Sequence, residues 1–176
     1  NIWLGTDYGI SLSRYNSALQ FVPISQITGT GDGNQFYSLF RDSKGFYWFG
    51  GTNGVIRFTH PAGNKHDAIW YRMGDKNHPL SHNRIRHIYE DREQQLWIAT
   101  DGSINRYDYN THQFVHYNIV DSTGTYNTNW AYYLFEDTDG KLWIATCLGG
   151  IFVVDKHKLI QSAGRSYVAD QNYSIH

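Results

Sequence analysis

A short apolar run centred on tryptophan occurs four times along the chain. The four copies are Asn1–Thr6, Phe46–Gly51, Gln95–Thr100 and Lys141–Thr146. Their tryptophans, Trp3, Trp48, Trp97 and Trp143, are separated by 45, 49 and 46 residues. A period of this length is typical of proteins that repeat one supersecondary unit, so we expect the four segments to occupy equivalent places in the fold.

Each unit contains four short segments that predict strands. An apolar strand, as at Ile85–Tyr89, is followed by an acidic turn, and the tryptophan strand comes next. A glycine-containing loop leads to a third strand, as at Ser103–Asp108, and a more polar fourth strand follows at Phe114–Tyr117. The last copy of the fourth strand is weak, and we place it at Ser166–Ala169. No sufficiently long run of apolar residues at helical spacing predicts a helix.

Four strands per unit predict an all-β fold, a β-propeller with about four blades of four antiparallel strands each. We place an incomplete blade at 1–35, blades at 36–83, 84–129 and 130–170, and a tail or the start of a next blade at 171–176. Because the chain opens within a blade, we interpret residues 1–176 as a partial propeller from a longer protein. The tail could pair back onto the opening blade and close a four-bladed ring. Its poor match to the repeat favours a larger ring.

The composition agrees with this fold and narrows the classes of partner. Aromatic residues make up 16% of the 176 residues, and 17 glycines against three prolines suit many tight turns. The formal net charge of −1 gives no electrostatic argument for binding nucleic acid or an anionic membrane. The single cysteine, Cys147, excludes an internal disulfide.

The sequence also resembles a known repeat family. The string Glu-Asp-x-x-Gly-x-Leu-Trp-Ile-Ala-Thr at Glu136–Thr146 closely resembles the two-component regulator propeller repeat, and Arg106-Tyr107-Asp108 matches its last element. The resemblance covers nearly the whole chain. It implies a seven-bladed propeller in the periplasmic sensor region of a bacterial hybrid histidine kinase, many of which detect oligosaccharides. The implied partners are the remaining blades and the downstream domains of the same protein. Separately from the resemblance, an open half-ring would expose blade faces, so a homodimer is a further possible partner.

Repetition separates structural residues from candidate ligand-binding residues. We interpret the four tryptophans as core residues, because burial of the indole ring suits sheets packed on each other. One asparagine stands eight residues before each of the three turn aspartates. These asparagines are Asn34, Asn83 and Asn129. We expect them to cap the strand starts by bonding their own backbone, with a ring of amides around the channel as the alternative.

The residues that do not repeat are the candidates for binding. In a propeller, the loop before the first strand and the loop after the tryptophan strand open on one face, where ligand sites gather. That face would collect Tyr8, Asn53, Arg84, Asp101 and Trp130. A flat aromatic side chain beside polar groups suits a sugar, so Trp130 is the central candidate. The alternative is that Trp130 plugs the channel.

Patterns for metals, cofactors and catalysis are weak. His112 and His116 are four residues apart on a predicted strand, about 13 Å from each other, which is too far to share one zinc ion. We therefore predict no metal and no cofactor. The leading hypothesis is a non-catalytic sensor segment that contributes to oligosaccharide recognition. The alternatives are a polysaccharide lyase or glycosidase that uses Asp101 or Asp121, and a purely structural or dimerising segment.

Overall fold

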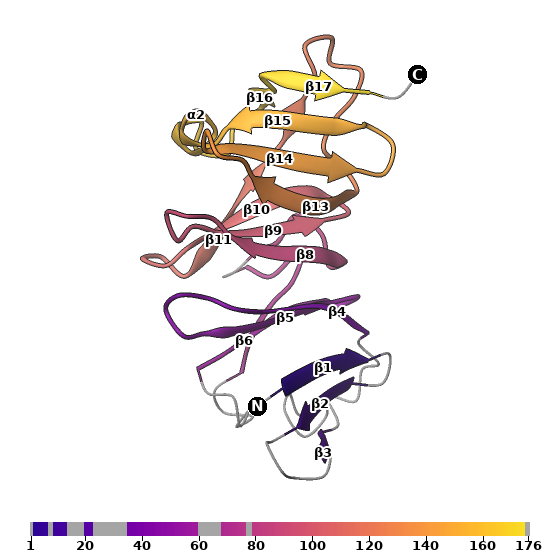
Figure 1. The fold of residues 1–176 in the computed structure, drawn as a ribbon, viewed down its shortest axis with the longest axis vertical. Helices are drawn as coiled ribbons and strands as arrows, with labels where there is room; N and C mark the ends of the chain where they lie inside the picture. The colour runs from indigo at the N-terminus through magenta and orange to yellow at the C-terminus, as the bar shows by residue number, and fades with distance from the viewer. Residues whose placement is uncertain are drawn as a thin grey trace.

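Four antiparallel sheets lie one after another along the long axis of the molecule (Figure 1). The structure is a computed structural model that describes residues 2–6, 9–13, 20–22, 35–59, 68–76 and 79–174. The first sheet contains β1 (Ile2–Thr6), β2 (Gly9–Ser13) and β3 (Gln20–Val22). The second contains β4 (Phe36–Arg41), β5 (Tyr47–Gly51), β6 (Gly54–Phe58) and β7 (Ile69–Tyr71).

The remaining two blades repeat this four-stranded arrangement. The third sheet contains β8 (Ile85–Glu90), β9 (Leu96–Thr100), β10 (Ser103–Asp108) and β11 (Gln113–Tyr117). The fourth contains β13 (Ala131–Glu136), β14 (Lys141–Thr146), β15 (Ile151–Asp155) and β17 (Gln171–Tyr173). The predicted all-β partial propeller is confirmed. The tryptophan strand is the second strand of each four-stranded sheet, whereas in the first sheet it is β1, the first described strand.

The core lies between neighbouring blades. Trp48 of the second blade packs in one cluster with Leu96 and Ile98 of the third blade. Trp97 of the third blade packs in another cluster with Leu142 and Ile144 of the fourth. Both indole rings are fully buried, so each tryptophan stabilises the contact with the blade that follows it.

The outer face of the fourth blade carries the equivalent tryptophan, Trp143. No blade among the described residues covers this face. Trp143 is only partly buried and stacks on Tyr173, with ring centroids 5.9 Å apart and planes inclined by 10°. Phe135 and Ile151, on the same face, are exposed. The side chain of Trp3 lies outside the described residues.

Each turn aspartate holds the tryptophan six residues after it. The Oδ2 atoms of Asp42, Asp91 and Asp137 accept the indole N–H at 2.8, 2.9 and 2.7 Å, respectively. Each Oδ1 also accepts a backbone N–H four residues along the turn. Sequence reasoning found the turn role of these acids but missed the bond to the indole.

The last outer strand differs from the prediction. Residues 167–168 form β16, which pairs in parallel with β12 (Ile119–Val120) outside the blade. The outer strand is β17, within the segment that we predicted to be a tail, and it pairs with β15. The predicted blade end at residue 170 is therefore wrong, and the paired residues of the tail complete the fourth blade rather than the first.

A short helix, α2 (Lys156–Gln161), also departs from the sequence prediction of strands alone. The Asp155 carboxylate caps it by accepting the backbone N–H groups of His157 and Lys158. Six residues are too few for helical periodicity to appear in the sequence. The helix lengthens the connection after β15 and so displaces the outer strand along the chain. No helix among the described residues is long and apolar enough to cross a membrane.

The contact of Asn83 differs from the strand-start cap that we expected of the repeated asparagines. The side chain of Asn83 accepts the backbone N–H of Met73, ten residues earlier, instead of a group of its own strand start. At Asn129 it is the side chain of Asn127 that accepts the backbone N–H and forms the turn. Asn34 lies outside the described residues. The structure therefore gives these positions different contacts in different blades.

Side chains bridge the inner strands of neighbouring blades. Ser38 Oγ accepts the N–H of Ile88 at 3.0 Å, and His87 Nδ1 accepts the N–H of Leu134 at 3.1 Å. The His87 ring stacks on Tyr133 with centroids 4.1 Å apart. Burial lowers the pKa of His87 from its ordinary value of 6.5. The neutral imidazole is therefore the form that the fold stabilises.

We expect the protein to lose stability as the pH falls from about 7.5 to about 5.5. The unfolded state takes up a proton on His87 near pH 6.5, whereas the folded state resists it, so the free energy of unfolding decreases on acidification. His87→Gln, whose side-chain oxygen can still accept the Leu134 N–H, should make this decrease smaller. Urea unfolding at both pH values measures the slope. An unchanged slope in the variant would show that His87 does not contribute, leaving His116, whose pKa burial also lowers.

Candidate ligand-binding site

A β-bulge occurs at the same place in the inner strand of three blades. The pairing passes from Phe36 to Ser38, from Ile85 to His87 and from Ala131 to Tyr133, leaving one extra residue each time. The extra residues are Tyr37, Arg86 and Tyr132. Because a bulge redirects the side chain of its extra residue, these three side chains do not follow the alternation of the strand.

Arg86 is fixed in place by a carboxylate and a ring. Its Nε and a terminal nitrogen donate to the two carboxylate oxygens of Asp101 at 2.7 and 3.2 Å. Its guanidinium lies 4.4 Å from the centroid of the Tyr132 ring, within cation–π distance. The hydrogen bond that Arg86 donates to Asp101 raises the pKa of the guanidinium, so this charge is permanent.

Arg84 approaches the same carboxylate more loosely. Its Nε is 3.9 Å from Asp101 Oδ2, and 49% of its side chain is exposed. Its backbone carbonyl accepts the N–H of Asp101 at 3.2 Å. The structure thus brings Arg84 and Asp101 together, as their shared position at the loop face predicts.

Trp130 joins this group through its backbone. Its N–H donates to the carbonyl of Asp101 at 2.9 Å, and its own carbonyl accepts the N–H of Cys147 at 3.0 Å. Its φ of 55° lies in the left-handed region, which a bulky residue adopts only at a cost of about 1–3 kcal/mol. The indole is 47% exposed. Backbone strain that leaves a large ring exposed is a feature that gathers at binding sites.

Gln35, Arg84 and Trp130 occupy equivalent positions. The carbonyl of each accepts a backbone N–H from the loop after the tryptophan strand, donated by Thr52, Asp101 and Cys147, respectively. These three positions therefore share one backbone role while their side chains differ. This pattern leaves the side chains available for recognition.

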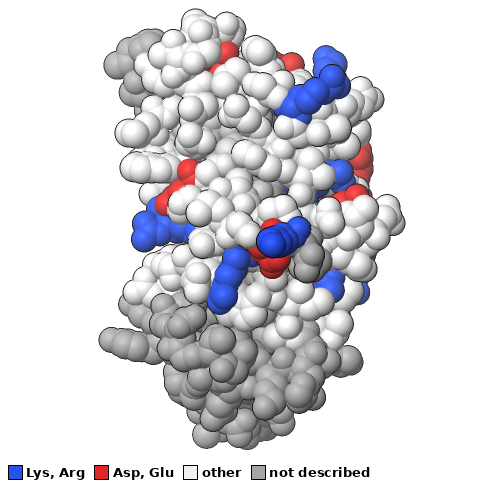
Figure 2. Space-filling view, turned by 180° about the vertical axis from the view of Figure 1, so that it is seen from behind, with Lys and Arg blue, Asp and Glu red and all other residues white. Residues whose placement is uncertain are grey.

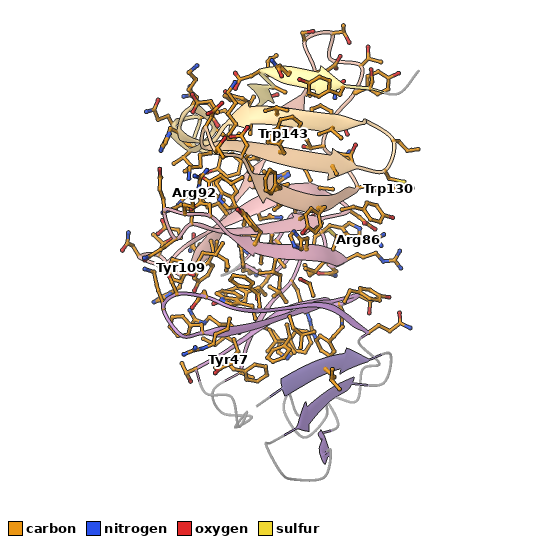
Figure 3. The ribbon with its side chains drawn as sticks, viewed as in Figure 1. Tyr47, Arg86, Arg92, Tyr109, Trp130 and Trp143 are labelled. Carbon is orange, nitrogen blue, oxygen red and sulfur yellow. The ribbon has the colours of Figure 1, made fainter. Side chains whose placement is uncertain are left out.

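A hollow of about 330 Å³ lies beside Trp130. Leu148, whose side chain is the most exposed large apolar group of the described residues, lies on its lining with Trp130. The other lining residues are Thr125, Tyr126, Asn127, Asn129 and Gly149. Figure 3 shows Trp130 and Arg86 at the same end of the strands, with Arg92, Tyr109 and Tyr47 toward the other end.

Other predicted residues lie elsewhere or serve the fold. The carbonyl of Asn53 accepts the Nε of Arg72 within the second blade, and Asn53 does not line the hollow beside Trp130. Tyr8 lies outside the described residues. His112 lies before β11, at a φ of 57°, so His112 and His116 are not on one strand. No group of three or more side chains suited to a metal occurs in the described part of the chain.

Asp121 organises its own loop. Its carboxylate accepts the hydroxyl of Thr123 at 2.5 Å and the backbone N–H of Tyr126 at 2.8 Å. The bond from Thr123 in particular lowers the pKa of Asp121 below its usual range. A carboxylate held in this way is a poor proton donor or acceptor at neutral pH. Asp101 is engaged in an ion pair with Arg86.

Sequence reasoning missed Arg86 and Tyr132. Both were assigned to the regular inner strand, where alternation would hide their direction. The available signal was that each stands two residues after a non-repeating position, Arg84 or Trp130, and itself does not repeat. Together with Trp130 they give the site aromatic surfaces beside fixed hydrogen-bonding groups, which is the chemistry that holds a sugar ring and its hydroxyls.

The stacked four-stranded sheets define the class of protein as a β-propeller. A family model described as the two component regulator propeller matches residues 30–53, 79–102 and 125–147. The chain therefore belongs to the two-component regulator propeller family, as the repeated string at Glu136–Thr146 indicated. No curated protein matches the chain.

Solved structures extend this comparison. The extracellular domain of BT4673 from B. thetaiotaomicron, described as a hybrid two component system, is 85% identical over 99% of this chain, with a TM-score of 0.86. This chain spans 23% of that domain's length. The extracellular domain of BT3049 from the same organism is 23% identical, with a TM-score of 0.59, over 80% of this chain and 19% of its own. PorZ from Porphyromonas gingivalis, a component of the type-IX secretion system, is 13% identical, with a TM-score of 0.59, over 97% of this chain and 25% of its own. The last two similarities establish the fold alone.

Proposed function

We propose that this chain is a non-catalytic part of the periplasmic sensor region of a hybrid two-component histidine kinase, and that it contributes to binding an oligosaccharide. The observation that carries the proposal is the hollow beside the strained and exposed Trp130. The 85% identity to the extracellular domain of BT4673 supports the sensor assignment and the location.

The arrangement of the acids supports binding rather than catalysis. Asp101 is paired with Arg86, and Asp121 is bonded within its own loop. Both candidate acids of the enzyme hypothesis are therefore already bonded to other groups of the chain. An oligosaccharide would instead place a ring on Trp130 and its hydroxyls against the side chains of Asn127, Asn129 and Tyr126.

The partners in this proposal are further blades and the downstream domains of the same protein. Binding at the loop face would be transmitted through the packed blades, because each tryptophan connects its blade to the next. A homodimer through the exposed face of the fourth blade is the alternative. Light scattering that shows a monomer of the intact sensor region would exclude it.

Trp130→Ala is expected to weaken oligosaccharide binding by about tenfold or more, because an exposed aromatic anchor in a hollow carries much of the binding free energy. Trp130→Phe, which keeps a ring, should lie between the wild type and Trp130→Ala. Calorimetry with a library of glycan fragments, using the intact sensor region, measures both variants. Ile69→Ala removes an exposed apolar side chain from β7 and serves as the control.

Two results would contradict the proposal. One is an intact sensor region that binds no glycan in the library. The other is a sensor in which exchange of this segment with that of a relative leaves the choice of ligand unchanged. Equal binding by the wild type and Trp130→Ala would move the ligand away from this hollow.

A further inference from the structure

We propose that the oligosaccharide bound here is acidic, and that Arg84 binds a carboxylate of a uronic acid unit whose ring lies beside Trp130. This inference rests on the proposed function and specifies the class of its ligand. It depends on the balance of charge at the loop face and on the freedom of one of its two arginines.

The first step is the balance of charge. Asp101 gives both carboxylate oxygens to Arg86, at 2.7 and 3.2 Å. The one ion pair of Arg84 with a described residue is its 3.9 Å approach to that same carboxylate, which is already in use. Among the described residues, two positive charges therefore face one negative charge, and the excess lies on Arg84.

The second step is that the described residues around the hollow do not cancel this excess. The described residues that line the hollow beside Trp130 are all uncharged. Asp121 belongs to the loop that borders the hollow, but its carboxylate is bonded to Thr123 and Tyr126 of that loop. In Figure 2, blue and red groups are scattered among white surface, so no broad field of one sign dominates the face shown.

The third step is geometric. Arg84 and Trp130 are equivalent residues of adjacent blades, and both contact the backbone of Asp101, one through its N–H and the other through its carbonyl. Arg86 is held between the Asp101 carboxylate and the Tyr132 ring, so its guanidinium is not free to turn toward a ligand. Arg84, half exposed, can still orient its planar fork toward a carboxylate and bind it with two parallel hydrogen bonds.

These features together match a sugar that carries its acid on the ring. A uronic acid presents an apolar face for an indole and a carboxylate at the ring's edge for a guanidinium. A neutral sugar would leave Arg84 with only its 3.9 Å approach to the Asp101 carboxylate, so it would gain less from the site. The charge on the ligand therefore determines selectivity, while Trp130 contributes to binding of acidic and neutral sugars alike.

The test uses the intact sensor region and matched pairs of ligands. Uronate oligosaccharides from digests of pectin, alginate and glycosaminoglycans are each compared with the same sample after its carboxylates are reduced to alcohols. We expect calorimetry to show binding of at least one acidic sample, with affinity about 10- to 100-fold above that of its reduced counterpart. Raising the salt concentration should weaken the acidic ligand more than the neutral one.

Variants locate the effect. Arg84→Gln should remove most of the preference for the acidic sample, and Arg84→Lys should restore part of it, since a lysine keeps the charge but loses the planar fork. Arg41→Gln makes the same charge change on an exposed arginine at the far end of β4 and should leave the preference intact.

The outcomes separate this inference from the proposed function. Binding of neutral and acidic samples with equal affinity, lost in Trp130→Ala, would overturn the acidic ligand and keep the sugar site. Binding of neutral glycans alone would do the same. Failure to bind any acidic or neutral sample at millimolar concentration would overturn both.

Discussion

Trp97→Ala is expected to lower the free energy of unfolding by about 3–5 kcal/mol. The ring is fully buried among residues of the third and fourth blades, so its removal leaves a cavity between two sheets. The change also removes the donor that bonds Asp91 Oδ2 at 2.9 Å. Urea unfolding of the 176-residue chain, followed by circular dichroism, measures the loss as a lower midpoint with an unchanged slope.

Trp143→Ala is the matched control for this prediction. Trp143 has the same place in the repeat and the same bond to a turn aspartate, Asp137, but no described blade covers its outer face. In this chain, we expect Trp143→Ala to lower the free energy of unfolding by less than half as much as Trp97→Ala does. In a longer protein, in which a further blade packs on that face, the two losses should become similar. Equal losses in the 176-residue chain would show that inter-blade burial is not the source of the stability.

The fold could be predicted in large part because the same order of strands and turns recurs in each repeat. The tryptophan at 97 alone would indicate only a buried strand. Four such runs in register fix the strand order of a blade and the family. The prediction of the outer strand failed in the fourth blade, where the segment after Asp155 has no counterpart in the other repeats. There a six-residue helix moves the outer strand to Gln171–Tyr173, and no second copy of that segment exists to reveal it.

The candidate site was predicted less completely, for a physical reason. Arg84, Asp101 and Trp130 could be found because they break the repeat at positions that the fold places on one face. Arg86 and Tyr132 were missed, because the direction of their side chains depends on a bulge, and a bulge changes the register without leaving a residue type as its signature. Their failure to repeat was the one signal of them in the sequence. The positive φ of Trp130 likewise has no residue type that marks it in the sequence.

Lys156, the first residue of α2, connects the fourth blade to the third through a buried cluster of charges. Its side chain is 1% exposed, and its Nζ lies 2.6 Å from Glu136 Oε1 and 3.3 Å from Asp91 Oδ2. Glu136 also accepts the backbone N–H of Arg92 at 2.9 Å, in the turn of the third blade. Lys156 thus places one buried cation between carboxylates of two blades.

Lys156→Met is expected to lower the free energy of unfolding at neutral pH by about 3–5 kcal/mol, because it leaves two buried carboxylates without their shared cation. Lys158→Met, two residues along the same helix, removes an exposed lysine that lies 3.7 Å from Asp155 and should change stability by no more than about 0.5 kcal/mol. Urea unfolding of both variants measures the difference. Similar losses in the two would show that burial of the cluster has no special cost.

The pH dependence distinguishes loss of a charge partner from loss of packing. Burial alone would raise the pKa of Glu136, but the bonds from Lys156 and Arg92 hold it below its ordinary value of 4.5. In the wild type this contribution to stability is present above pH 4.5 and is lost as the pH falls through the lowered pKa. In Lys156→Met the burial effect prevails, so protonation of Glu136 relieves the unpaired charge. The deficit of the variant relative to the wild type should therefore shrink as the pH falls from about 7 toward about 4.5. A deficit that stays constant over this range would assign the loss to packing of the lysine stem instead.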